Sequence, residues 1–247
     1  MQNKTFYKVA LLLAVLYFSA GNLQSKPIRL MVITGGHDYQ EEQFNRMFES
    51  LGKKFTYRVV SLPEAFSVFK PENRAGYDVL VFYHMWQDIT GEDKKNLSEC
   101  ISEGKPLVVL HHSICGFDDW PEYINIIGGK YLMKPAVIDR VEYNASTYKH
   151  DVRINVQVVN PGHSVTRGIK DFEIIDETYN GLYIHPTSLP LLTTNEPTSS
   201  PVIAWTKKYG KSQVVTLQGG HDRQAFENPN FRRLLKQSIL WVSKESR

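Results

Sequence analysis

The sequence predicts an α/β protein with a mostly parallel sheet, helices on both faces and an antiparallel extension near the C-terminus. Apolar runs and helical stripes alternate through the first half, as parallel sheets with right-handed crossovers require. The second half instead contains an alternating segment at 151–159 and two strand-like runs that turn at Tyr209-Gly210-Lys211. No low-complexity linker interrupts this pattern, so residues 26–247 are predicted to form one domain.

Each element of the first half has its own signature. Residues 28–34 are almost continuously apolar, as expected of a strand buried on both faces. Asp38 and Glu41 have the spacing of a capping box, and an apolar stripe over 44–51 predicts a helix after them. Further strands are predicted at 55–62, 77–83 and 106–110, with a helix over 90–104.

The final helix is predicted to begin at Asn228-Pro229, a favourable cap followed by proline at the first helical position. Its buried stripe comprises Phe231, Leu234, Leu235, Ser238, Ile239 and Val242.

The N-terminus has the pattern of a secretory signal. Lys4 and Lys8 precede an apolar run over 9–20, which is too short to span a bilayer. Small residues suit cleavage after Gly21, with Ser25 as a second option. We therefore expect a signal peptide at 1–21, with cleavage as late as 25, and a periplasmic or secreted protein without a membrane span after cleavage. An uncleaved anchor is the alternative.

Charge and cysteine content narrow the class of protein further. The formal net charge is +3, and Lys4 and Lys8 supply two of these charges, which argues against a nucleic-acid or acidic-lipid partner. Cys100 and Cys115 are predicted at opposite ends of a strand–helix layer, so we expect two free thiols.

Histidines gather at predicted strand ends, and two of them belong to a repeated Gly-Gly-His-Asp turn. Ligands of open parallel sheets bind beyond the carboxyl ends of the strands, so these imidazoles are predicted to share one site. Successive side chains of a strand point to opposite faces of the sheet. Only one of His111 and His112 should therefore face a cavity, unless the strand has ended before them. His150 is predicted to be solvated. The strand-end histidines are His37, His84, His111, His112 and His221.

Imidazoles and carboxylates suit metal binding and acid–base chemistry alike. No compact zinc signature is present, so a divalent metal would need ligands from distant loops, with His37, His111 and His185 as candidates. Nucleotide-binding glycine motifs are absent. The turn after 106–110 contains Ser113 and Cys115 but lacks the glycines of a nucleophile elbow.

Aromatic residues near these loops suit a sugar, whose C–H face stacks on rings while its hydroxyl groups bond to acids and amides. Packing against the sheet edge is the alternative. The aromatic residues are Trp86, Phe117, Trp120, Tyr123, Tyr179 and Tyr183, with Asp118, Asp119 and Asn180 nearby.

Five segments together resemble the ThuA-like (trehalose-utilisation) family: VITGGHDYQEEQF, VVLHHSICGFDDWPEYINIIGGKY, PGHSVTRGI, DETYNGLY and GGHDRQAFENPNFRRLL. The resemblance implies a flavodoxin-like, class I glutamine amidotransferase-like fold and a role in sugar catabolism, often beside oxidoreductases acting on disaccharides such as trehalose. The amidotransferase nucleophile is missing. The positions that match are His37, His111, His112, His163, Glu177, Tyr179, His221 and Asp222.

These observations predict an exported carbohydrate-catabolic enzyme that cleaves or rearranges a glucoside or 3-keto-glucoside. A non-catalytic sugar-binding or accessory protein of the envelope and a metal-dependent amidohydrolase are the alternatives. The expected partner is a small carbohydrate, and the oligomeric state stays open. The predicted catalytic residues are His112, His221, Glu177 and His163, and the predicted substrate-binding residues are His37, Asp38, Trp86, Trp120, Tyr179 and Asp222.

Overall fold

Nine strands form one continuous sheet in the order β2-β1-β3-β4-β13-β12-β11-β8-β9. The computed structural model describes residues 26–245, so the predicted signal peptide lies outside the described residues. Among the helices within that range, none is long and apolar enough to cross a bilayer. The strands of the sheet are β1 (Ile28–Gly35), β2 (Phe55–Ser61), β3 (Val79–His84), β4 (Leu107–Leu110), β8 (Thr147–Val158), β9 (Phe172–Asn180), β11 (Leu189–Thr194), β12 (Val202–Tyr209) and β13 (Ser212–Leu217).

Two small ladders lie outside the sheet, β5 (Gly129–Lys130) with β10 (Tyr183–Ile184) and β6 (Ala136–Ile138) with β7 (Val141–Tyr143). The α-helices are α1 (Glu41–Glu49), α2 (Gly91–Ser102), α3 (Glu122–Ile127), α4 (Arg223–Glu227) and α5 (Pro229–Glu245). The 3₁₀ helices within residues 26–245 are η1 (Glu64–Phe69) and η2 (Pro71–Gly76), between β2 and β3, and η3 (His111–Cys115), after β4.

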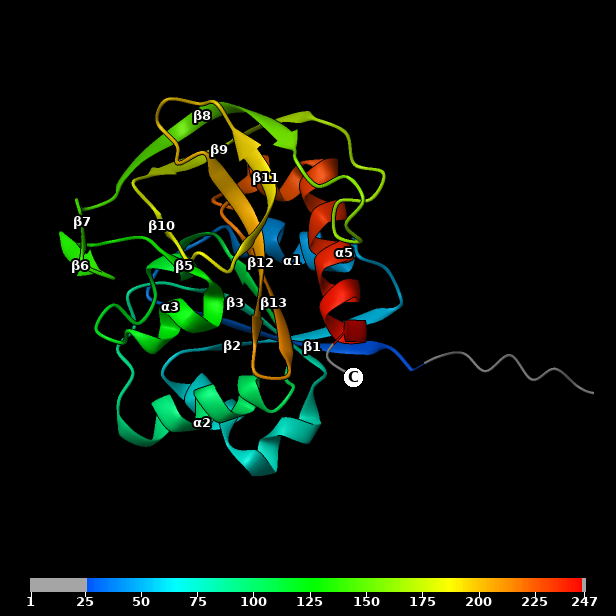
Figure 1. Cartoon of the computed structure of the whole chain (residues 1–247). Coiled ribbons are helices and arrows are strands. Elements are labelled where there is room, and N and C mark those ends of the chain that lie inside the picture. The colour runs from blue at the N-terminus through cyan, green and yellow to red at the C-terminus, as the bar shows by residue number, and fades with distance from the viewer. Residues whose placement is uncertain (1–25, 246–247) are drawn as a thin grey trace, which may run out of the picture.

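The strands from β2 to β13 along the sheet are mutually parallel, and helices cover both of their faces. Strands β3 and β4 are buried along their whole length, which explains their unbroken apolar sequences. Their side chains alternate between two cores, one formed with α1, α4 and α5 and the other with η1, α2 and α3. Figure 1 shows these two layers of helices on either side of the sheet.

Beyond β13 every pairing is antiparallel, and the far edge of the sheet returns to the parallel half. The Asp176 carboxylate in β9 accepts backbone N–H bonds from Gly220 at 2.7 Å and His221 at 3.0 Å, just after β13. In Figure 1 the β8–β9 pair lies across the end of the molecule opposite α2. The predicted mostly parallel sheet with an antiparallel extension is confirmed. Because the far edge of the sheet returns to the parallel half, β9 lies over the carboxyl ends of the parallel strands.

The two Gly-Gly-His-Asp turns lead into their helices in different ways. Helix α1 begins at Glu41 with Gln40 as its cap and no side-chain cap bond, so the predicted Asp38–Glu41 capping box is wrong. Asp38 lies two residues before the cap position that Gln40 occupies. Asp222 instead caps the unpredicted short helix α4, by accepting from the Gln224 N–H at 2.8 Å.

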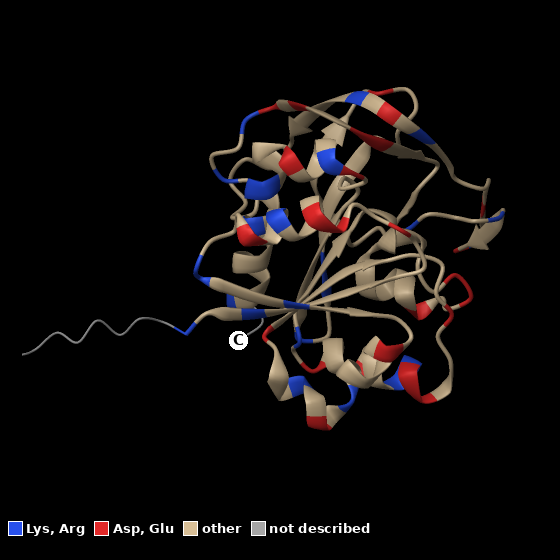
Figure 2. Cartoon of the chain, turned by 180° about the vertical axis from the view of Figure 1, so that it is seen from behind, with Lys and Arg blue, Asp and Glu red and all other residues tan. Residues whose placement is uncertain are grey.

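Charged residues of both signs are mixed over the surface (Figure 2), and both cysteines are free thiols. Basic and acidic residues alternate over the outer helices and loops, and the central parallel strands carry few of either (Figure 2). Cys100 and Cys115 are both free and buried, as predicted.

Candidate functional site

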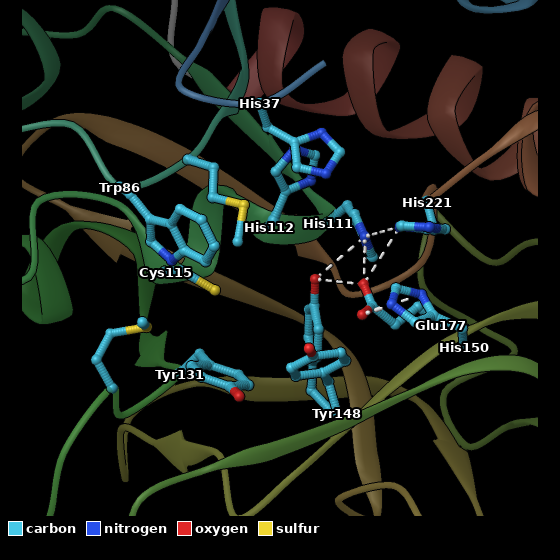
Figure 3. A pocket seen from close by; sticks show the side chains of 13 residues that line it. His37, Trp86, His111, His112, Cys115, Tyr131, Tyr148, His150, Glu177 and His221 are labelled. Atoms are coloured by element: carbon cyan, nitrogen blue, oxygen red, sulfur yellow. Dashed lines mark hydrogen bonds and ion pairs between the residues drawn. The ribbon is translucent and has the colours of Figure 1, made fainter. Parts of the chain in front are cut away.

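A cavity of about 170 Å³ lies at the carboxyl ends of the parallel strands, beneath the returning β8–β9 edge (Figure 3). Histidines and one carboxylate form one wall, and aromatic and sulfur-containing side chains form the other. Its lining residues are His37, Met85, Trp86, His111, His112, Cys115, Tyr131, Met133, Tyr148, His150, Glu177, Tyr179 and His221.

The Glu177 carboxylate on β9 is the centre of the polar wall. Its Oε2 lies 2.9 Å from His111 Nε2 and 3.3 Å from His221 Nδ1, and it accepts a bond from the Tyr179 hydroxyl at 3.0 Å. Burial alone would raise the pKa of Glu177, but the bonds to His111 and His221 outweigh it and hold this pKa far below its usual range. The carboxylate is therefore ionised at neutral pH. The hydrogen bond between His221 and Glu177 raises the pKa of His221 above its ordinary value.

His111 is held in a fixed orientation by the backbone. Strand β4 ends at Leu110, and His111 opens η3 with φ of +49°, a conformation that is costly for a residue other than glycine. Its Nδ1 lies 2.8 Å from the carbonyl oxygen of Gln218, which can only accept a hydrogen bond. Nδ1 therefore carries the proton, and Nε2 points towards Glu177.

His112 also faces the cavity, because the strand has ended before the histidine pair begins. It is 2% exposed, and within residues 26–245 neither of its ring nitrogens has a hydrogen-bond partner. Burial holds the pKa of His112 well below its usual range, so the ring is neutral. His37 packs edge-on against it with ring centroids 4.6 Å apart, and burial lowers the pKa of His37 too.

His150 was predicted to be solvated, but it belongs to the pocket. Lys149 pairs with Thr178 and Val152 with Asp176, so His150 and Asp151 form a β-bulge opposite Glu177. The bulge turns the imidazole inward and places its Nδ1 3.4 Å from Glu177 Oε1, although half of the side chain stays exposed.

The rim of the cavity is apolar and exposed. Trp86 is 56% exposed and Tyr148 is 60% exposed, with Met133 and Tyr131 beside them. Trp86 has φ of +49° in the loop after β3. That loop packs on the first Gly-Gly-His-Asp turn, where Gly36 has φ of +79° and a Cβ would lie 1.8 Å from the Met85 carbonyl oxygen. Only glycine permits this approach, which fixes the position of the Trp86 loop.

Several predicted site residues lie outside the cavity. His84 is fully buried on the opposite side of β3 against Phe117, and burial lowers the pKa of His84 to about 3. His163 packs on Trp241 of α5, away from the site. His185 bonds to Thr187 beside a separate surface hollow. Of the predicted substrate-binding residues, Trp120, Asp38 and Asp222 are not among those that line the cavity.

The alternative nucleophiles are also accounted for. The Ser113 hydroxyl bridges the backbone N–H and carbonyl of His84, so it joins β3 to η3 and is fully buried. Cys115 lines the cavity, but burial raises the pKa of its thiol, which disfavours the reactive thiolate. Neither residue is arranged as an activated nucleophile.

A parallel half-sheet with helices on both faces, and a polar site at its carboxyl ends, defines a flavodoxin-like α/β protein of the class I glutamine amidotransferase-like type. Residues 29–242 match the ThuA family, which is described as "Trehalose utilisation". The chain belongs to this family.

Solved structures with the same fold include two putative ThuA-like proteins. The one from Parabacteroides merdae is 18% identical with a TM-score of 0.73, over 88% of this chain and 90% of that one. The one from Bacteroides uniformis is also 18% identical, with a TM-score of 0.68 over 91% and 95%. A putative GMP synthase protein from Thermoplasma acidophilum is 10% identical, with a TM-score of 0.53 over 89% and 96%. No curated protein sequence matches the chain.

Proposed function

We propose that this chain is an exported enzyme of carbohydrate catabolism that cleaves a 3-keto-glucoside by proton transfer within the pocket. The observation that carries the proposal is His112, a buried imidazole whose nitrogens have no partner in the described part of the chain and which faces the cavity. Such a ring is available to take a proton from a bound substrate. The family description, trehalose utilisation, supports a sugar as that substrate.

The dimensions of the site support one sugar ring inside and a second group at the mouth. The cavity of about 170 Å³ is below the range of about 300–1,000 Å³ found for drug-sized ligands. Trp86 and Tyr148 at the rim offer ring faces to the C–H groups of a sugar. The imidazoles on the opposite wall would then meet its oxygen atoms.

The proposed reaction uses the acidity that a C3 ketone confers on the neighbouring C2–H. His112 takes the C2 proton, and the electron pair of the broken C–H bond forms a C1–C2 double bond. The C1–O bond breaks, and the aglycone leaves with its electron pair and takes up a proton. Water then adds across the double bond and gives the free keto-sugar.

The test is an assay of the purified protein with synthetic 3-keto-glucosides and the matching unoxidised glucosides, with and without added divalent metal. We expect release of the aglycone from the keto substrates and little from the unoxidised ones. If every substrate stays intact, the proposal is wrong. Calorimetry on the same sugars then shows whether the protein is a binding protein without catalysis.

Export is proposed from the signal-like pattern of residues 1–21. Expressed with its full sequence in a bacterial host, the protein is expected in the periplasm or medium. N-terminal sequencing should then begin after Gly21 or as late as after Ser25. Protein retained in the cytosol with Met1 or Gln2 at its N-terminus would contradict export.

A further inference from the structure

We propose that the pocket binds one divalent first-row transition-metal ion between His111, Glu177 and His221. Their ligand atoms are His111 Nε2, Glu177 Oε2 and His221 Nδ1. His111 Nε2 lies 2.9 Å from the carboxylate oxygen and 3.1 Å from His221 Nδ1, and the third separation is 3.3 Å. The three residues come from the start of η3, from β9 and from the loop after β13, so the fold assembles a site that no linear motif marks.

The orientation of His111 favours metal binding through its Nε2. Because Nδ1 donates to the Gln218 carbonyl, Nε2 is the ring nitrogen that is directed into the cluster. Nε2 lies 2.9 Å from Glu177 Oε2 and 3.1 Å from His221 Nδ1, so it faces two further potential ligand atoms, with the Tyr179 hydroxyl 3.1 Å away beside them. A histidine that donates Nδ1–H to a carbonyl while Nε2 meets a cation is the usual arrangement of a metal ligand.

The spacing of the three ligand atoms is also close to that of ligands around one metal ion. Ligands bound at about 2.1 Å, with bond angles from about 90° to about 109°, lie about 3.0–3.4 Å apart. The observed separations of 3.1 and 3.3 Å lie within that range, and the third, 2.9 Å, lies just below it, before any side chain moves.

Hydrogen bonds alone fill the same space less well. Glu177 Oε2 lies within hydrogen-bond distance of the Tyr179 hydroxyl, His111 Nε2 and His221 Nδ1, and the Tyr179 hydroxyl also lies 3.1 Å from His111 Nε2. One oxygen with two lone pairs cannot accept hydrogen bonds from all three groups. A divalent ion among these atoms would bind the imidazole nitrogens directly and leave Tyr179 as the donor to Oε2.

The ligand set narrows the class of ion. Two imidazoles and one carboxylate hold Zn²⁺ in catalytic sites and Fe²⁺ in oxygen-activating sites, whereas Ca²⁺ and Mg²⁺ prefer oxygen ligands. The three residues line the cavity (Figure 3), so an ion held by them would be open to a substrate in that cavity. Polarisation of the C3 carbonyl by this ion rests on the proposed function, but metal binding itself does not.

The test measures Zn²⁺ and Co²⁺ binding to protein stripped with a chelator, by calorimetry and by the visible absorption of bound Co²⁺. We expect about one ion per chain, and a loss of affinity of at least about 100-fold in Glu177→Gln and in His221→Ala, because loss of a ligand exceeds the 10–100-fold cost of losing a supporting contact. Glu173→Gln is the matched control, since Glu173 lies exposed on the same strand and pairs with Arg153. It should bind as the wild type does.

Failure of the wild-type protein to bind either ion overturns the proposal, as does wild-type affinity in both pocket variants. His221 lies partly exposed in a loop, so His221→Ala should stay folded even if Glu177→Gln does not. Metal binding without turnover of keto-glucosides would refute the proposed function alone. Turnover in excess chelator by protein that binds no metal would refute the metal site alone.

Discussion

Replacement of His112 with phenylalanine is expected to lower kcat/KM on 3-keto-glucosides by about 10²–10⁴-fold, the usual contribution of a general base. The variant should nevertheless fold with at least the stability of the wild type. Neither nitrogen of His112 has a hydrogen-bond partner among residues 26–245, so phenylalanine removes two unsatisfied polar atoms from the interior. It also keeps a ring next to Tyr83, whose centroid lies 4.6 Å away.

His84→Phe is the matched control, because His84 is a second buried histidine with two unpartnered ring nitrogens within the described residues. It lies outside the cavity, so its replacement should leave turnover unchanged. Steady-state kinetics and calorimetric unfolding of both variants separate catalysis from packing. Turnover that survives in His112→Phe would remove His112 from the reaction.

Replacement of Asp176 with alanine is expected to lower the free energy of unfolding by about 3–4 kcal/mol, since three N–H groups lose a buried acceptor. The Asp176 carboxylate accepts from the backbone of Glu177, Gly220 and His221 at 2.7–3.0 Å, and the side chain is 3% exposed. These bonds hold β9 against the loop after β13. Loss of Asp176 should therefore also separate Glu177 from His221 and lower the affinity of the pocket for its ligands.

Asp171→Ala is the control for this change. Asp171 accepts one N–H bond, from Val158 at 2.8 Å in an exposed position, so its loss should cost about 1 kcal/mol or less. Urea denaturation of both variants gives the comparison. Asp176→Asn, which keeps one acceptor oxygen, should fall between the wild type and the alanine variant. Equal stabilities of Asp176→Ala and Asp171→Ala would show that the β9 contact does not stabilise the fold.

The parallel half of the fold was predictable because its buried strands are almost continuously apolar, as at 28–34 and 106–110. Strand β9 was not predicted, and its role in the site explains why. Asp176, Glu177 and Thr178 are all buried there, where a sequence-based assignment expects apolar side chains. The polar residues that β9 contributes to the site therefore also prevent its recognition as a buried strand from the sequence.

The site was predictable to the extent that it follows from strand ends. His37, His111, His112 and His221 converge because the carboxyl ends of parallel strands share one edge. The rest depends on features that leave no mark in sequence order. A bulge turns His150 inward, and loops that face away carry His163 and His185 to other surfaces. No motif in the sequence marks the remaining pocket residues, Tyr131, Tyr148 and the two methionines, as part of the site.

The order of strands in the sheet also bears on synthesis of the chain. Strand β13 lies between β4 and β12, although it is the last strand to be made. As the chain emerges, β4 pairs with β3 but keeps its other edge open until residues 212–217 arrive. That edge is the wholly apolar sequence Leu-Val-Val-Leu, the kind of unpaired strand that recruits other chains. We therefore expect the nascent protein to expose an aggregation-prone strand edge until β13 has been made, so that co-expressed chaperones should raise its soluble yield.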